Sequence, residues 1–158
     1  MNISSTKDVA QEKITEFFKL HWGSTKMVIS SGVYDCCELE GFSFLNNEEI
    51  EGLITYKIMN NECEIISLDS LKEGRGIGTA LVQQVEKFAL ENNCKVLKLV
   101  TTNDNLNALK FYQKRGFILS RIINNAVEAA RRIKPQIPKK GLFDIPLRDE
   151  IELKKFLI

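Results

Sequence analysis

The stretch that most constrains this chain is a glycine-rich segment, L-D-S-L-K-E-G-R-G-I-G-T, from Leu68 to Thr79. A short apolar run precedes it, and an amphipathic segment from Ile77 to about Glu91 follows it. A strand, a glycine loop and a helix in this order aim backbone N–H groups and a helix N-terminus at an anion. Arg75, inside the loop, adds a guanidinium suited to phosphate. The sequence therefore predicts a site for a phosphate-bearing molecule.

The two commonest glycine-loop motifs do not fit this segment. A Walker loop ends in Gly-Lys-Ser/Thr, and no Lys follows a suitably spaced glycine here. A dinucleotide loop starting at Gly76 and Gly78 would need a third glycine at position 81, where Leu81 stands. One alternative stays open, a plain tight turn with a helix packed closely behind it.

Composition indicates one globular domain over residues 1–158, with 44% hydrophobic and 27% charged residues. The net charge of +1 gives no reason to expect a nucleic-acid or membrane partner. The first 20 residues carry several charges, unlike a signal peptide, and no run reaches the roughly 20 apolar residues of a membrane span.

The chain offers few metal ligands. It has four cysteines, none in a C-x-x-C pair, and His21 is its single histidine. We therefore expect no metal site. Without a leader, the expected location is cytoplasmic, where thiols stay reduced.

Periodicity predicts the elements on both sides of the loop. A helix is expected over residues 7–20, with Thr6 as its N-cap. Asn-rich turns separate strands expected near 38–45, 51–59 and 63–68, which indicates an antiparallel meander. Further elements are a strand at 95–100, a helix at 106–115 capped by Asn105, a strand at 117–120, a helix at 124–133 and a final strand near 149–153.

Two segments together resemble the GNAT superfamily of N-acetyltransferases. The first is the loop, where the family has Gln or Arg, two residues, Gly, one residue, and Gly or Ala. Gly76 and Gly78 match this pattern, whereas Glu73 departs from it and is expected to point to solvent. The second is N-x-N-A-L-K-F-Y-Q-K-R-G-F, from Asn105 to Phe117.

The resemblance implies a fold and a co-substrate. The fold class would be α/β (α+β), a mixed, mostly antiparallel sheet of six to seven strands flanked by about four helices, with a splayed central pair of parallel strands. The co-substrate would be acetyl-coenzyme A (acetyl-CoA). Its binding residues would be Ile66, Ser67 and Leu68 on the strand, Gly74, Arg75, Gly76, Ile77, Gly78 and Thr79 in the loop, and Asn105 and Lys114 in the second motif. A merely solvated Lys114 remains open.

The same resemblance gives catalytic candidates. Tyr112 stands where the family often keeps a tyrosine that protonates the departing thiolate, and an aromatic packed under the sheet is the alternative. Glu64 and Glu62 share one face of an alternating strand, so either could take the amine's proton. Asp69 is a weaker third choice, and simple surface carboxylates are the alternative. A backbone N–H near Leu68 would stabilise the oxyanion.

The function expected from these features is transfer of an acetyl group to a primary amine of a small molecule or peptide, directly within a ternary complex. A non-catalytic acyl-CoA-binding sensor is the alternative. Acids and aromatics near residues 20–50 favour a cationic amine. Homodimers are common among proteins that resemble this one.

Overall fold

The computed structural model describes residues 2–157 and divides into two compact units. The first unit comprises residues 2–27, 34–97 and 157, and the second comprises 28–33 and 98–156. A single domain over the whole chain stays a prediction. Within residues 2–157, no helix is long and apolar enough to span a membrane.

The first unit contains an antiparallel meander, as predicted. Its strands are hydrogen-bonded in the order β1 (Ile3–Ser5), β4 (Glu40–Asn46), β5 (Glu49–Met59) and β6 (Glu62–Ser70). Every neighbouring pair in this order is antiparallel. Asn60 and Asn61 both have positive φ angles, which suits the tight hairpin turn expected at this Asn pair. In the other hairpin, the positive φ angles fall on Asn47 and Glu48, one position after the expected Asn46-Asn47 turn.

A bulge in β6 changes which side chains share a face of the sheet. Ser67 pairs with Thr55 and Ile65 pairs with Tyr56, so Ile66 is an extra residue opposite a single step of β5. Simple alternation would put Asp69 and Glu64 on opposite faces. Because of the bulge, Asp69 lies on the same face as Glu64.

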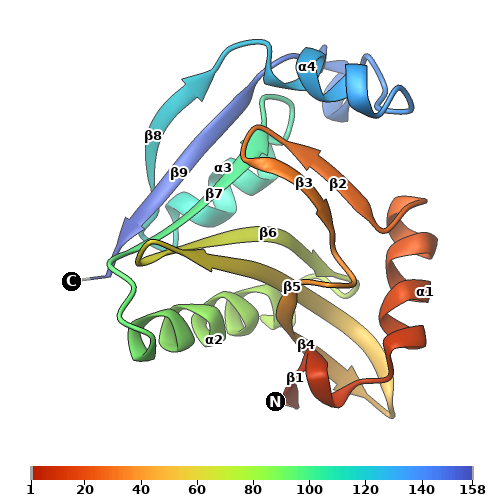
Figure 1. Cartoon of the computed structure of the whole chain (residues 1–158), viewed down its shortest axis with the longest axis vertical. Coiled ribbons are helices and arrows are strands. Elements are labelled where there is room, and N and C mark those ends of the chain that lie inside the picture. Colours follow the sequence, from red (N-terminus) through yellow and green to blue (C-terminus); the bar gives the residue numbers. More distant parts are fainter. Residues whose placement is uncertain (1, 158) are drawn as a thin grey trace. The chain divides into compact units, whose positions relative to one another are not determined.

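The helix α2 (Ile77–Glu91) packs against β4, β5 and β6, on the face of the sheet opposite to Asp69 and Glu64 (Figure 1). Its bounds match the predicted helix. Gly52 of β5 permits the close approach, because a Cβ there would lie 2.5 Å from the Cγ2 of Ile77 and 3.0 Å from the Cδ1 of Leu81. Further along the helix, the ring of Phe88 contacts Tyr56, with centroids 5.4 Å apart.

The predicted start of the first helix is wrong. The chain forms a 3₁₀ turn, η1 (Thr6–Asp8), and then the helix α1 (Gln11–Trp22). The cap is Ser5, whose Oγ accepts a hydrogen bond from the Lys7 N–H, and the buried Thr6 instead donates to the Gly41 carbonyl. The extended backbone of Val9 separates the two helices. Gly23, with φ of 73°, ends α1.

The second unit contains most of the later elements. They are β7 (Val96–Thr102), α3 (Leu106–Gln113), β8 (Ile118–Ile123), α4 (Ala126–Ile133), η2 (Leu142–Asp144) and β9 (Glu150–Phe156). The predicted final strand, β9, lies between β7 and β8 and pairs antiparallel with β8. Two short strands, β2 (Lys26–Ile29) and β3 (Gly32–Asp35), form a separate ribbon.

The fold class is confirmed. The described residues form four α-helices and seven main-sheet strands, and the pairings β1–β4, β4–β5, β5–β6 and β8–β9 are antiparallel. Both counts agree with the expected six to seven strands and about four helices.

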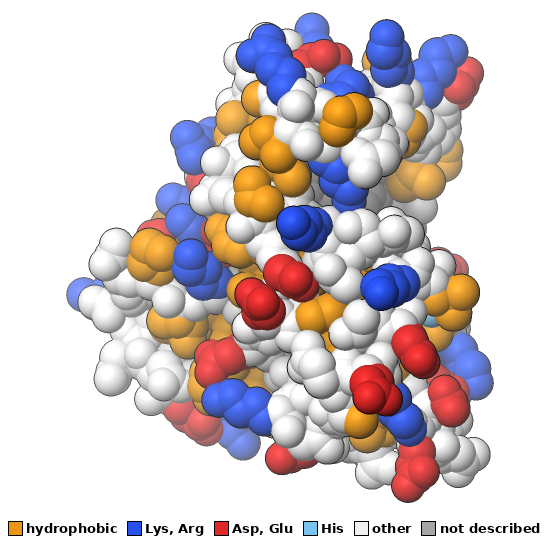
Figure 2. All heavy atoms as spheres, turned by 45° about the vertical axis from the view of Figure 1, so that its right-hand side comes forward, with side chains coloured by type: hydrophobic (Ala, Val, Ile, Leu, Met, Phe, Trp, Pro, Cys, Tyr) orange, Lys and Arg blue, Asp and Glu red, His pale blue; other side chains and the backbone are white. Residues whose placement is uncertain are grey.

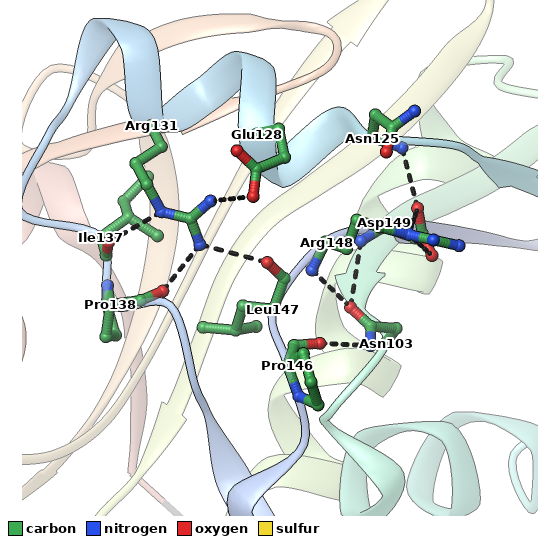
Figure 3. A network of polar contacts seen from close by, with 10 residues as sticks. All are labelled: Asn103, Asn125, Glu128, Arg131, Ile137, Pro138, Pro146, Leu147, Arg148 and Asp149. Carbon is green, nitrogen blue, oxygen red and sulfur yellow. Dashed lines mark hydrogen bonds and ion pairs between the residues drawn. The ribbon is translucent and has the colours of Figure 1, made fainter.

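Arg131 organises the irregular segment that follows α4 (Figure 3). Its guanidinium donates to the carbonyls of Ile137, Pro138 and Leu147 at 3.1, 2.8 and 3.1 Å, and it also pairs with Glu128. The Arg131 side chain is only 12% exposed. It therefore has a structural role in holding the segment from 134 to 147 against α4.

Candidate functional site

The glycine loop between β6 and α2 has the open geometry that an anion site needs. Gly74 and Gly76 have φ angles of 78° and 74°, which favour glycine. A Cβ built at either position meets no atom within 4 Å, so both glycines face open space. The backbone here can therefore approach a ligand without obstruction by side chains.

The N-terminus of α2 follows at once. In its first turn, the Ala80 N–H donates to the Gly76 carbonyl at 3.0 Å. The amides of Ile77 and Gly78 precede that bond, in the helix position whose donors point outward along the axis. The first turn carries no acidic residue that would repel an anion. The predicted strand, loop and helix are confirmed, and a diphosphate fits this donor set.

Arg75 is placed beside a carboxylate that sequence reasoning missed. Its NH1 lies 3.5 Å from the Oε2 of Glu51, a residue of β5. The Oε1 of Glu51 pairs with Lys72 at 2.8 Å and accepts from Asn46 at 3.0 Å. Two loop cations therefore share one acid. Glu73, as expected, is exposed.

The strand segment predicted to bind the arm of the cofactor lies at the bulge of β6. Ile66 and Ser67 are buried and Leu68 is half-buried. The Ser67 and Thr55 hydroxyls are hydrogen-bonded at 2.6 Å, so the Ser67 side chain is held on the face opposite α2. Backbone pairing of residues 66–68 with a ligand stays a prediction.

Asp69 is held by the last residue of α1. The indole Nε1 of Trp22 lies 3.0 Å from each oxygen of the Asp69 carboxylate. Burial raises the pKa of Asp69 to about 6, and this rise is opposed first by the Trp22 hydrogen bond and then by the charge of His21. A carboxyl group with a pKa near neutrality can accept a proton from a substrate.

Glu64 and Glu62 share a face, as predicted. They lie opposite Lys57 and Met59 of β5, on the face that also carries Asp69. Glu64 is buried, whereas Glu62 is half-buried. Leu68 and Glu64 lie opposite Ile54 and Lys57 of β5, three steps apart because of the bulge at Ile66, or roughly 10 Å at the usual rise of a strand. Asp69 immediately follows Leu68. Which carboxylate acts as base stays a prediction.

Three predicted site residues belong to the second unit. Asn105 caps α3, because its Oδ1 accepts from the Ala108 N–H at 3.1 Å. Lys114 is exposed just past the end of α3. Tyr112 is buried between the rings of Phe111 and Phe117, with centroid distances of 5.0 and 5.3 Å. The expected cap is confirmed, and contacts of these residues with a cofactor stay predictions.

The cysteines are unsuited to nucleophilic catalysis. All four are free thiols, and burial raises the pKa of both Cys36 and Cys63 to about 12. Within residues 2–157, no cluster of three His, Cys, Asp or Glu side chains could hold a metal ion.

The small net charge hides an asymmetry between the units. Fifteen Asp and Glu face nine Lys and Arg in the first unit, against six and thirteen in the second. The formal charges are −6 and +7, which give the net +1 of the chain. Figure 2 shows one face of the molecule, on which acidic, basic and hydrophobic side chains are interspersed. An excess of acid in one unit would attract a cationic ligand to it.

Comparisons with known proteins agree with this geometry. Residues 9–117 match the profile of the acetyltransferase (GNAT) family. The uncharacterized protein YxbD of Bacillus subtilis (strain 168) is 53% identical over 99% of both chains. A GNAT family acetyltransferase from Elizabethkingia anophelis, solved with acetyl-CoA bound, is 25% identical with a TM-score of 0.65, covering 77% of this chain and 78% of its own.

A second solved structure shares the fold over the whole length. It is a Bacillus subtilis acetyltransferase in complex with CoA, with 16% identity, a TM-score of 0.70 and coverage of 99% of both chains. The glycine loop, the second motif and the family match over most of the chain lead to one conclusion: this protein belongs to the GNAT family of acetyltransferases.

Proposed function

We propose that this acetyltransferase moves an acetyl group from acetyl-CoA to a primary amine of a cationic small molecule or peptide. The observation that carries the proposal is the open glycine loop at the N-terminus of α2. Gly74 and Gly76, both with positive φ and no neighbouring atom in the way, leave room for a diphosphate against backbone donors. Acetyl-CoA bound there would supply an activated thioester.

Different residues of the protein would then bind the cofactor and stabilise the reacting groups. The loop amides from Arg75 to Thr79 would hold the diphosphate, and the backbone of residues 66–68 would pair with the pantetheine arm. Asn105 and Lys114 would contribute from the second motif. The Leu68 N–H would stabilise the oxyanion as the amine nitrogen attacks the acetyl carbonyl.

We favour Asp69 as the proton acceptor. If Leu68 marks the reacting carbonyl, Asp69 is one residue away, whereas Glu64 and Glu62 lie roughly 10 and 17 Å along the strand. The Trp22 hydrogen bond fixes the carboxylate, and burial raises its pKa to about 6, so it is mostly ionised at pH 7 and can receive the proton. As the C–S bond breaks, Tyr112 would give its proton to the departing sulfur.

The acidic first unit supports a cationic acceptor. Its formal charge of −6 would attract an ammonium ion, and Trp22, which is 40% exposed, offers an aromatic side chain beside the Asp69 carboxylate. The four free thiols also fit a reducing, cytoplasmic location, which we infer together with this function.

The experiment is an acetylation screen. Purified protein and acetyl-CoA are incubated with polyamines, aminoglycosides, lysine derivatives and peptides, and free CoA is measured with a thiol reagent. The expected result is CoA release with at least one cationic amine and a mass gain of one acetyl group on that amine. A neutral analogue of the best acceptor serves as the matched control.

The screen also tests the sensor alternative. Calorimetry with CoA is run in parallel, together with Tyr112→Phe, which keeps the ring packed between its neighbours. Tight CoA binding with no turnover on any amine, and no effect of the Tyr112 change, would favour the sensor. No CoA binding at all would reject both readings.

A further inference from the structure

Glu51 is a buried carboxylate directly beside the glycine loop. Its side chain is only 9% exposed, and the hydrogen bond from Lys72 followed by that from Asn46 lowers its pKa, so it is ionised at neutral pH. Its Oε1 is held by Lys72 and Asn46. Its Oε2 is buried and has no hydrogen bond within the described part of the chain, and Arg75 lies 3.5 Å away.

The backbone of residues 51–52 contacts both ends of the same loop. The Leu71 N–H, at the start of the loop, donates to the Glu51 carbonyl at 2.9 Å. The next residue, Gly52, admits Ile77, the first residue of α2, at the end of the loop. One dipeptide of β5 therefore contacts the loop where it begins and where it ends.

The energetics explain why such a residue matters. A loop with glycines at 74 and 76 has many conformations available, and ordering it for a ligand costs conformational entropy. A buried carboxylate strongly favours conformations in which a cation remains close. Glu51 therefore restrains Lys72 and Arg75 before any ligand arrives.

We propose that Glu51 is a positioning residue for the cofactor loop: it holds Lys72 and Arg75 so that the backbone donors are arranged to receive the diphosphate. Glu51 is itself an anion and does not touch the diphosphate. It acts through the loop, and its effect is confined to ligands that carry the diphosphate. This inference rests on the proposed binding of CoA at the loop.

The test compares two neutralised acids of the same strand. Glu51→Gln removes the buried charge, and Glu49→Gln removes an exposed charge two residues away as the matched control. Calorimetry gives the Kd for CoA, and ligand-observed NMR gives the Kd for pantetheine, which lacks the diphosphate. We expect Glu51→Gln to weaken CoA binding about 3- to 10-fold, the range for loss of two partly exposed ion pairs. Pantetheine binding, and both affinities of Glu49→Gln, should stay at wild-type values.

A second variant covers the case in which Glu51→Gln folds poorly. Asn46→Ala removes the neutral hydrogen bond that orients the Glu51 carboxylate, from a residue outside the loop. It should weaken CoA binding in the same direction, by about 2-fold, again without affecting pantetheine. In Arg75→Gln, the additional effect of Glu51→Gln should shrink, because the two residues then no longer interact.

Several outcomes would overturn the inference. Tighter CoA binding by Glu51→Gln would show that Glu51 competes with the ligand for Arg75. An equal loss for CoA and pantetheine would show a general structural defect, and no change would show that the contact has no role. The proposed function fails separately, if the wild-type protein does not bind CoA at all.

Discussion

Trp22 donates its indole N–H to both carboxylate oxygens of Asp69, at 3.0 Å each. The two residues are 47 positions apart, at the end of α1 and near the end of β6. A single donor shared between two oxygens fixes the plane of the carboxylate without neutralising it. This arrangement suits a group that must be oriented and ionised to take up a proton.

The first prediction concerns the role of Asp69 in acetyl transfer. Asp69→Asn keeps an oxygen that can accept from Trp22 but cannot take up a proton at neutral pH. We expect kcat/KM for the amine to fall about 100-fold, a usual loss for a general base. The Kd for CoA, measured by calorimetry, should not change.

The pH profile adds a readout that a purely structural role would not move. The wild-type kcat/KM should rise with pH as Asp69 loses its proton near pH 6, and the variant should lack this limb. Trp22→Phe removes a hydrogen bond that favours the ionised form, so the limb should shift to higher pH. Glu64→Gln is the matched control. If it abolishes the limb and Asp69→Asn does not, the base is Glu64.

The second prediction concerns stability. The pKa of Asp69 is raised from 3.8 to about 6 in the folded protein, so the folded state binds this proton more tightly than the unfolded state. The stability from this group is therefore complete below pH 4 and is lost as the pH rises through about 6. Asp69→Asn removes that dependence.

Urea unfolding at pH 4 and pH 7.5 would measure the effect. Relative to the wild type, Asp69→Asn should gain of the order of 1 kcal/mol between the two pH values, a discounted figure because the carboxylate is only half-buried. Asp35→Asn, on the same unit, is the control. An equal difference at both pH values would mean that the Asp69 pKa is not raised.

Much of the fold could be predicted because its signals are local. The bounds of α2 follow from a 3.6-residue apolar period and a glycine loop before it, and the cap of α3 follows from an Asn at the right position. The hairpin turns follow from Asn residues, which tolerate positive φ, although the first turn includes Glu48 and lies one position later than the Asn pair. Each of these signals lies within a few residues of the feature it predicts.

The features that were missed depend on residues far apart in the sequence. The bulge at Ile66 is defined by pairing with β5. It places Asp69 on the same face of the sheet as Glu64, whereas simple alternation would place it on the opposite face. The partnership of Glu51 with Arg75 likewise depends on where β5 passes the loop. Neither feature can be inferred from the positions of the acidic residues in the sequence, because no local pattern determines strand register or the packing of distant segments.

The third prediction separates two neighbouring arginines of α4. Arg131 donates to three carbonyls and is mostly buried, whereas Arg132 is exposed. Arg131→Ala should lower the free energy of unfolding by about 2 to 4 kcal/mol, because it leaves those carbonyls without their donor. Arg132→Ala should change stability by less than about 0.5 kcal/mol.

The same pair tests whether a basic stretch of the sequence, which contains Arg131, Arg132, Lys134, Lys139 and Lys140, binds the 3′-phosphate of CoA. A comparison of CoA with 3′-dephospho-CoA by calorimetry should give the same ratio of affinities in Arg132→Ala as in the wild type if that arginine is simply solvated. A smaller ratio in the variant would assign Arg132 to the 3′-phosphate. Thermal melts of both variants give the stability difference independently.

The last prediction uses two glycines with almost the same backbone conformation. Gly76 has φ of 74° and begins α2, and Gly23 has φ of 73° and ends α1. Neither has an atom within 4 Å of a built Cβ. An alanine at either position should therefore lower the free energy of unfolding by about 1 kcal/mol through the same backbone strain.

Only the alanine at Gly76 would project its methyl group into the space that we assign to the diphosphate. We expect Gly76→Ala to weaken CoA binding about 10-fold, while Gly23→Ala binds CoA like the wild type despite an equal loss of stability. If both variants lose affinity equally, the loss comes from strain alone and the diphosphate does not lie at this loop.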